Sequence, residues 1–348
     1  MIAVKKEGVV LSKTTLEFEN EGVLNPAAIK EDDKVHLFYR AVRKGNYSTI
    51  GYCRLNGPLE VEYRQGFPLL IPDFDYEKQG IEDPRIVKIE GIYYLSYTAY
   101  DGVNALGCLA TSSDLVSFKK HGILVPQISY EDFSKLSETN SLVNSKYFRF
   151  NQHLGIPEKN GVKMLVWDKN LIFFPRKIKG KLHFMHRIRP EIQIVIAIDT
   201  LEDLTIEFWD EYFVHFQHFI LLSSKYDHEI SYIGGGCPPI ETAFGWLLIY
   251  HGVKDSLEGY VYSACAALLD LDNPQIEIAR LPYPLFEPEY EWELKGEVNN
   301  VCFPTGAVVF ENTLYIYYGA ADERIACASV SLPDLLEELM LNTLSDEK

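Results

Sequence analysis

A five-fold repeat of one short strand is the feature of this sequence that most restricts its fold. Each copy is an apolar run that ends in tyrosine or histidine and is followed by a polar or small residue. The copies are Leu37-Phe38-Tyr39-Arg40, Leu95-Ser96-Tyr97-Thr98, Phe184-Met185-His186-Arg187, Leu248-Ile249-Tyr250-His251 and Ile316-Tyr317-Tyr318-Gly319. Self-similarity of this kind is typical of folds built from repeated supersecondary units.

Each copy lies between two further strand-like segments. A second strand follows each copy after a turn-rich gap. Upstream of each copy a proline begins a short segment, and proline is tolerated there because the first residue of a strand needs no ladder partner. The proline segments are Asn25-Pro26-Ala27, Asp83-Pro84-Arg85, Phe174-Pro175-Arg176, Pro238-Pro239-Ile240 and Phe303-Pro304-Thr305. Repeated units of three or more strands indicate radial repetition. We therefore expect an all-β fold, a five-bladed β-propeller formed as one domain by residues 1–348.

Two segments depart from the repeat. Residues 202–232 form an insertion that we expect to be partly helical, and a segment of this kind can cover the mouth of the central channel. Residues 332–344 open with Pro333 and continue amphipathically, which predicts a short C-terminal helix against the side of the propeller.

Residues flanking the five prolines should converge near one mouth of the channel. Glu82-Asp83-Pro84-Arg85 places two carboxylates and a guanidinium there. A carboxylate in such a place can act as a general acid whose pKa is set by burial and neighbouring charge. An Asp-Pro turn with an Asp–Arg ion pair is the other reading of this tetrapeptide.

Basic side chains from several repeats should meet at the same mouth. Arg40, Arg187 and His251 occupy the same position in three of the repeats, and Lys169 lies upstream of the third copy. Together they would form a cationic cluster suited to a small oxyanion such as phosphate. Alternatively, each cation pairs with a local carboxylate.

Composition excludes several classes of function. Lys and Arg number 33 against 50 Asp and Glu, so the net charge of −17 disfavours nucleic acid and anionic membrane surfaces as partners. The N-terminus lacks a signal-like apolar run and no segment is apolar enough to span a bilayer, so we expect a cytoplasmic protein. The six cysteines show no C-x-x-C pair and are expected to be buried free thiols. With no P-loop and no H-E-x-x-H spacing, neither a nucleotide, a metal nor another cofactor is expected.

Ordered motifs along nearly the whole chain resemble those of glycoside hydrolase family 130, the five-bladed mannoside phosphorylases and mannosidases. The matching motifs are Asn25-Pro26-Ala27, Phe38-Tyr39-Arg40-Ala41, Gly80-Ile81-Glu82-Asp83-Pro84-Arg85-Ile86, Tyr97-Thr98-Ala99-Tyr100, Gly234-Gly235-Gly236-Cys237-Pro238-Pro239-Ile240-Glu241-Thr242, Gly245-Trp246-Leu247-Leu248-Ile249-Tyr250-His251-Gly252-Val253, Pro304-Thr305-Gly306 and Tyr317-Tyr318-Gly319-Ala320-Ala321-Asp322.

The resemblance implies a mechanism. Asp83 would protonate the glycosidic oxygen through the 3-hydroxyl of the mannosyl unit while a nucleophile attacks C1 with inversion. In the phosphorylases the nucleophile is inorganic phosphate and the product is α-mannose 1-phosphate. The residues that the resemblance places at phosphate are Lys169, Asn170, Arg187 and His251, with Arg40 nearby. The side chains expected to bind the sugar are Asn25, Arg85, Tyr97, Tyr250 and Asp322.

Alternatives to a phosphorylase remain at this point. In a β-mannosidase a carboxylate base would activate water, and Glu211, Glu229 or Glu241 could take that role. The intact cationic set and the expected cytoplasmic location favour the phosphorylase. A glycan-binding propeller without turnover is the non-enzymatic alternative, although a Glu-Asp-Pro-Arg motif beside cations is more than a lectin needs. The expected partners are a mannose-containing oligosaccharide, linked β-1,2 or β-1,4, and inorganic phosphate. Association into a homo-oligomer is compatible with the sequence.

Overall fold

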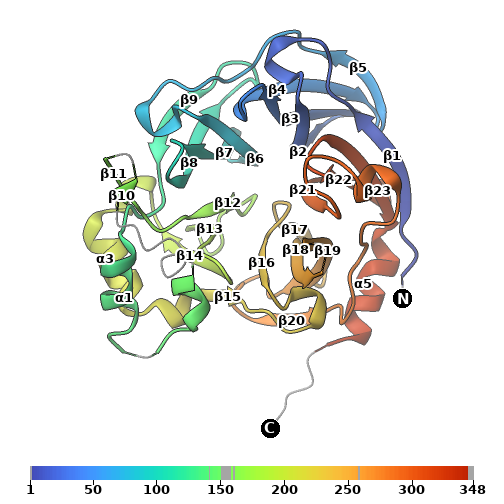
Figure 1. The fold of residues 1–348 in the computed structure, drawn as a ribbon. Coiled ribbons are helices and arrows are strands. Elements are labelled where there is room, and N and C mark those ends of the chain that lie inside the picture. Colours follow the sequence, from blue (N-terminus) through green and yellow to red (C-terminus); the bar gives the residue numbers. More distant parts are fainter. Residues whose placement is uncertain (1, 141, 150–157, 160, 258, 344–348) are drawn as a thin grey trace.

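The structure is a computed structural model that describes residues 2–140, 142–149, 158–159, 161–257 and 259–343, and these residues are mostly in β-strands (Figure 1). Antiparallel strands follow one another in five successive groups. In Figure 1 the first strand of each group lies near the middle of the molecule and the later strands lie toward the rim.

The first two groups belong to one sheet. The first group is β2 (Gly22–Glu31), β3 (Lys34–Arg43), β4 (Tyr47–Asn56) and β5 (Glu60–Arg64). The second group is β6 (Gly80–Ile89), β7 (Ile92–Tyr100), β8 (Ala105–Ser112) and β9 (Lys119–Ile123). A single parallel contact between Ser48 and Gly80 joins the two groups into an eight-stranded sheet.

The other three groups form separate sheets. The third is β12 (Lys169–Phe173), β13 (Leu182–Arg187), β14 (Ile192–Ile198) and β15 (Ile220–Leu222). The fourth is β16 (Tyr232–Gly235), β17 (Ile240–Thr242), β18 (Gly245–Ser256), β19 (Gly259–Leu269) and β20 (Glu277–Arg280). The fifth is β21 (Cys302–Phe310), β22 (Thr313–Ala320) and β23 (Arg324–Ser331), completed by β1 (Lys5–Leu11) from the other end of the chain. Because β1 pairs with β23, strands from both ends of the chain lie in one sheet.

The core is divided among the junctions between neighbouring groups. Five clusters of buried apolar side chains are present in the described residues, and each lies between two adjacent groups. Between the first and second groups, for example, Phe38 and Ile50 pack with Leu95 and Tyr97. The cluster between the fifth and first groups closes the series. All six cysteines are buried and free, which confirms that expectation.

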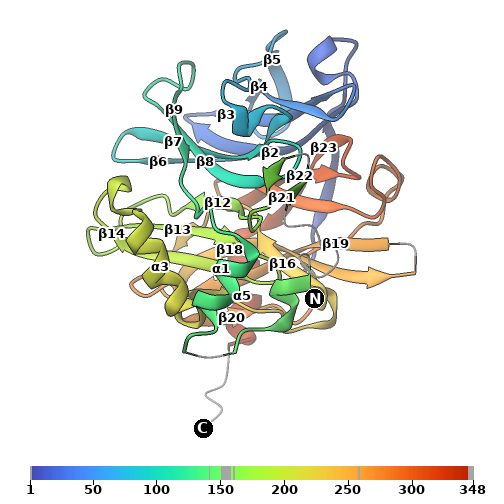
Figure 2. The same ribbon diagram turned by 60° about the vertical axis from the view of Figure 1, so that its left-hand side comes forward.

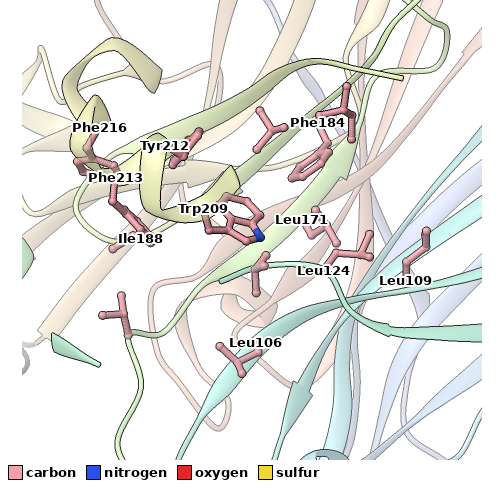
Figure 3. Packing of buried hydrophobic residues seen from close by; sticks show 14 of the residues in the cluster. Leu106, Leu109, Leu124, Leu171, Phe184, Ile188, Trp209, Tyr212, Phe213 and Phe216 are labelled. Atoms are coloured by element: carbon pink, nitrogen blue, oxygen red, sulfur yellow. The ribbon is translucent and has the colours of Figure 1, made fainter. Parts of the chain in front are cut away.

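The insertion is partly helical, as expected, but its helix lies away from the middle of the molecule. Helix α3 (Ile206–Val214) packs with α1 (Tyr130–Ser137) at the outer edge (Figures 1 and 2). Its buried face carries Trp209, Tyr212 and Phe213, which join the apolar cluster between the second and third groups (Figure 3). The helical part of the insertion therefore extends this junction and does not cover the central mouth, whereas the last residue of the insertion, Tyr232, begins the inner strand β16.

The C-terminal helix forms where the sequence predicts it. Helix α5 spans Leu332–Leu341, with Pro333 in its first turn and the Ser331 side chain accepting from the Asp334 N–H. Leu335 and Leu339 are buried against the fourth and fifth groups. The helix ends three residues before the predicted boundary, and residue 344 lies outside the described residues. No helix of the described chain is long and apolar enough to cross a membrane.

Short elements complete the structure. They are α4 (Glu291–Leu294), the hairpin β10 (Glu158–Lys159) and β11 (Val162–Lys163), and the single 3-10 turns η1 (Glu17–Glu19), η2 (Asp75–Glu77), η3 (Ser145–Phe148), η4 (Leu201–Asp203), η5 (Phe216–Phe219) and η6 (Asp227–Glu229).

A buried tyrosine, glutamate and cation recur in four of the five groups. In each, the tyrosine is the third residue of the sequence repeat, its hydroxyl donates to a fully buried glutamate, and a lysine or arginine pairs with the same carboxylate. The sets are Tyr39, Glu19 and Arg64; Tyr97, Glu77 and Lys120; Tyr250, Glu229 and Arg280; and Tyr318, Glu293 and Lys6. The third group differs, because His186 occupies this position and contacts Asp168 and Tyr212. The side chain at the third position of the repeat thus forms hydrogen bonds within its own strand group.

Candidate active site

Irregular backbone on the inner strands directs three polar side chains into one cavity. The register of β2, β6 and β12 shifts at Asn25, Asp83 and Asn170 respectively, and these residues have φ of 50°, 50° and 53°. A bulge redirects a side chain, and a non-glycine residue at such φ costs on the order of 1 to 3 kcal/mol, which the surrounding structure must offset. Strain repeated at equivalent places is typical of a functional site.

The three side chains line a central cavity of about 150 Å³. The structure also brings Arg40, Lys169, Arg187 and Asp322 to its wall, so seven of the residues expected at the site meet there. The remaining lining residues, which the sequence analysis did not single out, are Arg189, Tyr232, Tyr262, Val301 and Phe303. Phe303 immediately precedes one of the five repeated prolines, and that position is the signal that could have identified it.

Asp83 is held as a carboxylate in the free protein. Asn25 Nδ2 donates to Asp83 Oδ1 at 2.7 Å, and Arg40 Nη1 lies 3.9 Å from the same oxygen. Burial opposes ionisation of Asp83, but the charges of Arg40 and Lys169 and the Asn25 hydrogen bond outweigh it and hold the pKa below its ordinary value.

Glu82 organises the cations beside Asp83. Its carboxylate forms an ion pair with Arg40, at 2.9 Å from Nη2, and accepts from Lys169 Nζ at 3.3 Å. These two cations are therefore partly neutralised by a local carboxylate, which was one of the readings of the sequence. Arg40 is further fixed by Ser48, whose Oγ accepts from Arg40 Nε at 2.8 Å.

Asp322 is the second carboxyl group on the cavity wall. Burial raises the pKa of Asp322 to about 6, and the carboxylates of Asp83 and Glu82 act in the same direction while Arg40 opposes them. Two acidic groups of one cavity thus have pKa values displaced in opposite directions, a pattern frequent at catalytic sites.

Hydrogen-bond donors without protein partners gather at the cavity. Asn170 Nδ2 and Arg187 Nε are buried without a hydrogen-bond partner, and so are both ring nitrogens of His251. A buried polar group left unpaired costs about 1 to 3 kcal/mol. Three such side chains in one place are explained if a ligand with several acceptor oxygens forms the missing hydrogen bonds.

Close packing at Gly234 brings two of these donors together. A Cβ at this position would lie 2.5 Å from His251 Cε1 and 2.7 Å from Asn170 Nδ2. His251 itself is fully buried and lies behind the lining residues, with its ring centroid 4.4 Å from that of Phe303. Glycine is therefore needed for His251 and Asn170 to approach.

The charges of this donor set differ from the sequence expectation. Burial lowers the pKa of Arg187 to about 10, with Arg189 acting in the same direction, so Arg187 stays charged near neutral pH. Burial, and then the charge of Arg187, holds the pKa of His251 well below its ordinary value. His251 is therefore a neutral imidazole with one donor and one acceptor, and not a member of a cationic cluster.

Arg85 acts on the backbone beneath the cavity. Its Nη1 donates to the carbonyl oxygens of Asp83 and Pro84, each at 3.0 Å, and its Nε donates to the carbonyl oxygen of Gly236. Arg85 is 1% exposed and is not among the lining residues. Arg85 therefore holds the bulge that presents Asp83, while its Nη2 is buried without a hydrogen-bond partner.

Tyr97 and Tyr250 are also placed away from the cavity. Their hydroxyls donate to the buried carboxylates of Glu77 and Glu229 within their own strand groups. Because these hydroxyls are engaged and neither residue lines the cavity, we do not retain them as sugar ligands.

The three carboxylates considered as bases for water lie elsewhere. Glu229 is fully buried between Tyr250 and Arg280. Glu211 is exposed on α3 and pairs with His215. Glu241 is exposed and accepts from Arg176 Nε and Nη2 at 2.7 and 2.8 Å. The structure therefore contradicts the expectation that any of them reaches the cavity.

One group of side chains in the described residues has atoms close enough together to hold a metal ion. It consists of His228, Glu229 and Cys265. The Glu229 carboxylate is already paired with Arg280. A cation would therefore lie beside a guanidinium, which disfavours metal binding there.

Comparison with known proteins identifies relatives along nearly the whole chain. The sequence profile of glycoside hydrolase family 130, described as β-1,4-mannooligosaccharide phosphorylase, matches residues 6–341. A 1,2-β-oligomannan phosphorylase of Thermoanaerobacter sp. (strain X514) is 33% identical over 361 residues, covering 96% of this chain and 99% of the relative. A β-1,2-mannobiose phosphorylase of the same strain is 34% identical over 330 residues, covering 90% and 91%.

Solved structures share the fold. The β-1,2-mannobiose phosphorylase from Listeria innocua, solved with β-1,2-mannobiose, superposes with a TM-score of 0.73 at 22% identity, covering 98% of this chain and 100% of that one. The family match and the two phosphorylases place this chain in the class of glycoside-cleaving enzymes. Within that class, the chain belongs to glycoside hydrolase family 130.

Proposed function

We propose that the protein is an inverting β-mannoside phosphorylase that cleaves β-1,2-linked mannooligosaccharides with inorganic phosphate and releases α-mannose 1-phosphate. It is a mannoside phosphorylase by its family and by its relatives. The β-1,2 linkage is favoured because the three relatives that match over 90% or more of this chain are named for it, whereas a β-1,4-mannooligosaccharide phosphorylase of Ruminococcus albus matches over 50%.

The unpaired donors carry the proposal. Asn170, Arg187 and the neutral His251 offer hydrogen bonds that no protein group accepts. Phosphate is strongly hydrated, so fixed donors must replace its water and hold one oxygen in line with C1 of the sugar. A site of this kind suits a phosphate dianion, and Arg187 provides the charge that compensates for its desolvation.

Asp83 is proposed as the acid on the other side of the sugar. A proton on Asp83 would reach the glycosidic oxygen through the 3-hydroxyl of the mannosyl unit as the bond to C1 breaks. Asp83 is a carboxylate in the free protein because Arg40 and Lys169 are close. A phosphate dianion bound in the same cavity adds negative charge, which raises the pKa of Asp83 and prepares it to carry the proton. Asn25 would orient the carboxyl and Asp322 would bind sugar hydroxyls.

Hydrolysis is less well supported by this cavity. An inverting glycosidase needs a second carboxylate that activates water on the face opposite the acid. Glu211, Glu229 and Glu241 are all engaged away from the cavity. Asp322 does line the cavity, but it lies close enough to Asp83 and Glu82 for their charges to raise its pKa, which places it beside the proposed acid. The unpaired side chains at the cavity offer donors, which suit an anion better than a water that must lose a proton.

We also propose that the five strand groups are the blades of a single-domain, five-bladed propeller. Five apolar clusters, one for each junction between neighbours, support this architecture. So do the pairing of β1 with β23 and the central position of the first strands (Figure 1).

The test is an incubation of the protein with β-1,2-mannobiose, with and without inorganic phosphate, with β-1,4-mannobiose as the matched substrate. We expect α-mannose 1-phosphate and mannose from the β-1,2 disaccharide when phosphate is present, and neither when it is omitted. Mannose released at the same rate without phosphate would establish a hydrolase instead. Faster turnover of the β-1,4 disaccharide would contradict the proposed preference for the β-1,2 linkage.

A further inference from the structure

A second, smaller cavity adjoins the candidate active site. It has a volume of about 100 Å³, and its wall includes Lys146, Arg149, Arg189, Tyr232 and Tyr260; we call it the outer cavity. Arg189 and Tyr232 also line the central cavity, so the two cavities share a wall. Tyr260 belongs to the long β18–β19 hairpin, which projects from the body of the molecule (Figure 2).

Two segments that form the wall of the outer cavity are held by a buried framework. Lys146 Nζ donates to the carbonyl oxygen of Ile230 at 2.6 Å. Tyr147, the next residue, is 1% exposed and its hydroxyl donates to Glu191. Gln193 donates to the Tyr147 hydroxyl at 3.0 Å and to the Ile188 carbonyl oxygen at 3.1 Å. The segment that carries Lys146 and the loop that carries Arg189 are therefore fixed to each other.

Positive charge extends from the outer cavity to the unpaired donors. The guanidinium of Arg189 lies 4.6 Å from the centroid of the Tyr232 ring, and that of Arg187 lies 5.6 Å from it. Among the described residues that line the outer cavity, none is acidic. A chain of net charge −17 repels anions over most of its surface. A concave site with three cations is therefore where a small anion would collect.

The geometry points to a binding site for inorganic phosphate in the outer cavity, from which phosphate passes Arg189 and Tyr232 to the buried donors. This inference rests on the proposed function. Inversion requires phosphate and the leaving sugar on opposite faces of C1, so a bound oligosaccharide occupies the approach from the Asp83 side. Access through the outer cavity lets phosphate bind after the sugar, and the cations raise its local concentration.

The test removes two charges that touch neither substrate in the central cavity. The variant is Lys146→Gln with Arg149→Gln, and the charge-matched control is Lys5→Gln with Arg54→Gln, two cations whose side chains are 75% and 40% exposed on β1 and β4. We expect the KM for phosphate to rise about five- to tenfold in the first variant, because electrostatic attraction of this kind changes association over a range of about 10- to 1,000-fold. The kcat at saturating phosphate and the KM for β-1,2-mannobiose should stay within about twofold of the wild type.

Two further measurements separate the possible failures. Phosphate binding measured by calorimetry needs no turnover, so it tests the outer cavity even if the enzyme proves to be a hydrolase. Raised salt should weaken phosphate binding less in the variant than in the control, since screening acts on charges that the variant has lost. Equal phosphate affinity in variant and control would overturn the inference, as would a rise confined to the KM for mannobiose. Thermal unfolding of both proteins checks that each is folded.

Discussion

His186 Nδ1 lies 2.7 Å from Asp168 Oδ2 in the third strand group, at the place where the other four groups pair a tyrosine with a glutamate. The other oxygen of Asp168 accepts from the backbone N–H of Arg187 at 3.2 Å. Lys169 and Asn170 follow Asp168 directly in β12. The Asp168–His186 pair thus fixes the two strands that carry the proposed phosphate ligands.

Asp168→Asn should therefore weaken phosphate binding more than mannoside binding. We expect the KM for phosphate to rise about tenfold, equivalent to about 1.4 kcal/mol, with a smaller change in the KM for β-1,2-mannobiose. Weakening this buried hydrogen-bonded pair should also lower the free energy of unfolding, by about 1 to 3 kcal/mol.

Glu19→Gln is the matched control, because it breaks the equivalent pair with Tyr39 and Arg64 in the first group. It should lower stability to a similar extent and leave the ratio of the two KM values unchanged. The same rise in phosphate KM in both variants would show that Asp168 contributes only to stability.

Substitution of Glu229 should lower the free energy of unfolding far more than substitution of Glu241. We expect neither residue to act as a catalytic base. Glu229→Gln leaves the buried guanidinium of Arg280 without its Glu229 partner. We expect a loss of about 3 to 5 kcal/mol in urea unfolding. Glu241→Gln removes an exposed pair with Arg176, worth about 0 to 1 kcal/mol. If Glu241→Gln abolished turnover while folding normally, the phosphorylase mechanism would be wrong.

The sequence repeat predicted the strand groups because apolar segments followed by turns are local features. It could not separate two neighbouring positions of the repeat. The third position, Tyr97 or Tyr250, is turned into its own group, and the fourth, Arg187 or His251, lies toward the centre. Successive side chains point to opposite faces of a strand, so a residue that packs inside its group is followed by one that can contact a ligand.

A local signal for the buried glutamates was nevertheless present. An acidic residue, an aromatic or histidine residue and a glutamate recur before the first strand of four groups. These tripeptides are Glu17-Phe18-Glu19, Asp75-Tyr76-Glu77, Asp227-His228-Glu229 and Glu291-Trp292-Glu293. Recognising this pattern would have assigned Glu229 to the fold. The bulges at Asn25, Asp83 and Asn170 leave no comparable signal, because they depend on pairing with distant residues.

Asp83→Asn should remove turnover and retain folding. An amide cannot carry the proton that leaves with the acceptor sugar, and loss of a general acid lowers rates by about 100- to 10,000-fold. We expect kcat for β-1,2-mannobiose phosphorolysis to decrease by a factor in this range. Calorimetry should still detect binding of mannobiose to the variant. Retention of wild-type kcat would exclude Asp83 as the acid.

Asp322 makes stability depend on pH. Burial raises its pKa to about 6 in the folded protein, whereas the carboxyl of an unfolded chain has a pKa near 3.9. Between about pH 4 and 6 the folded state therefore binds more protons than the unfolded state, and the free energy of unfolding falls as pH rises through this window.

Asp322→Asn should remove this dependence. At pH 7.5 we expect the variant to be about 1 to 2 kcal/mol more stable than the wild type, after allowing for partial exposure, and the gain should vanish near pH 4. Urea unfolding at both pH values measures the difference, with the exposed Asp272→Asn as control. The activity of the Asp322→Asn variant should fall, since the carboxyl group of Asp322 is proposed to bind sugar hydroxyls. A gain of equal size at both pH values would contradict this account.

Gly234→Ala tests whether the approach of His251 to Asn170 forms the phosphate site. The added methyl group would lie 2.5 Å from His251 Cε1 and 2.7 Å from Asn170 Nδ2. One of the two side chains must move, and overpacking of this kind costs about 1 to 3 kcal/mol. Because these donors are proposed to face phosphate, the KM for phosphate should rise by about tenfold or more, and that for β-1,2-mannobiose should change less. Gly66→Ala, where a Cβ meets nothing within 4 Å, is the control and should leave both values unchanged. If Gly234→Ala raised the KM for mannobiose and not that for phosphate, the donors would belong to the sugar site instead.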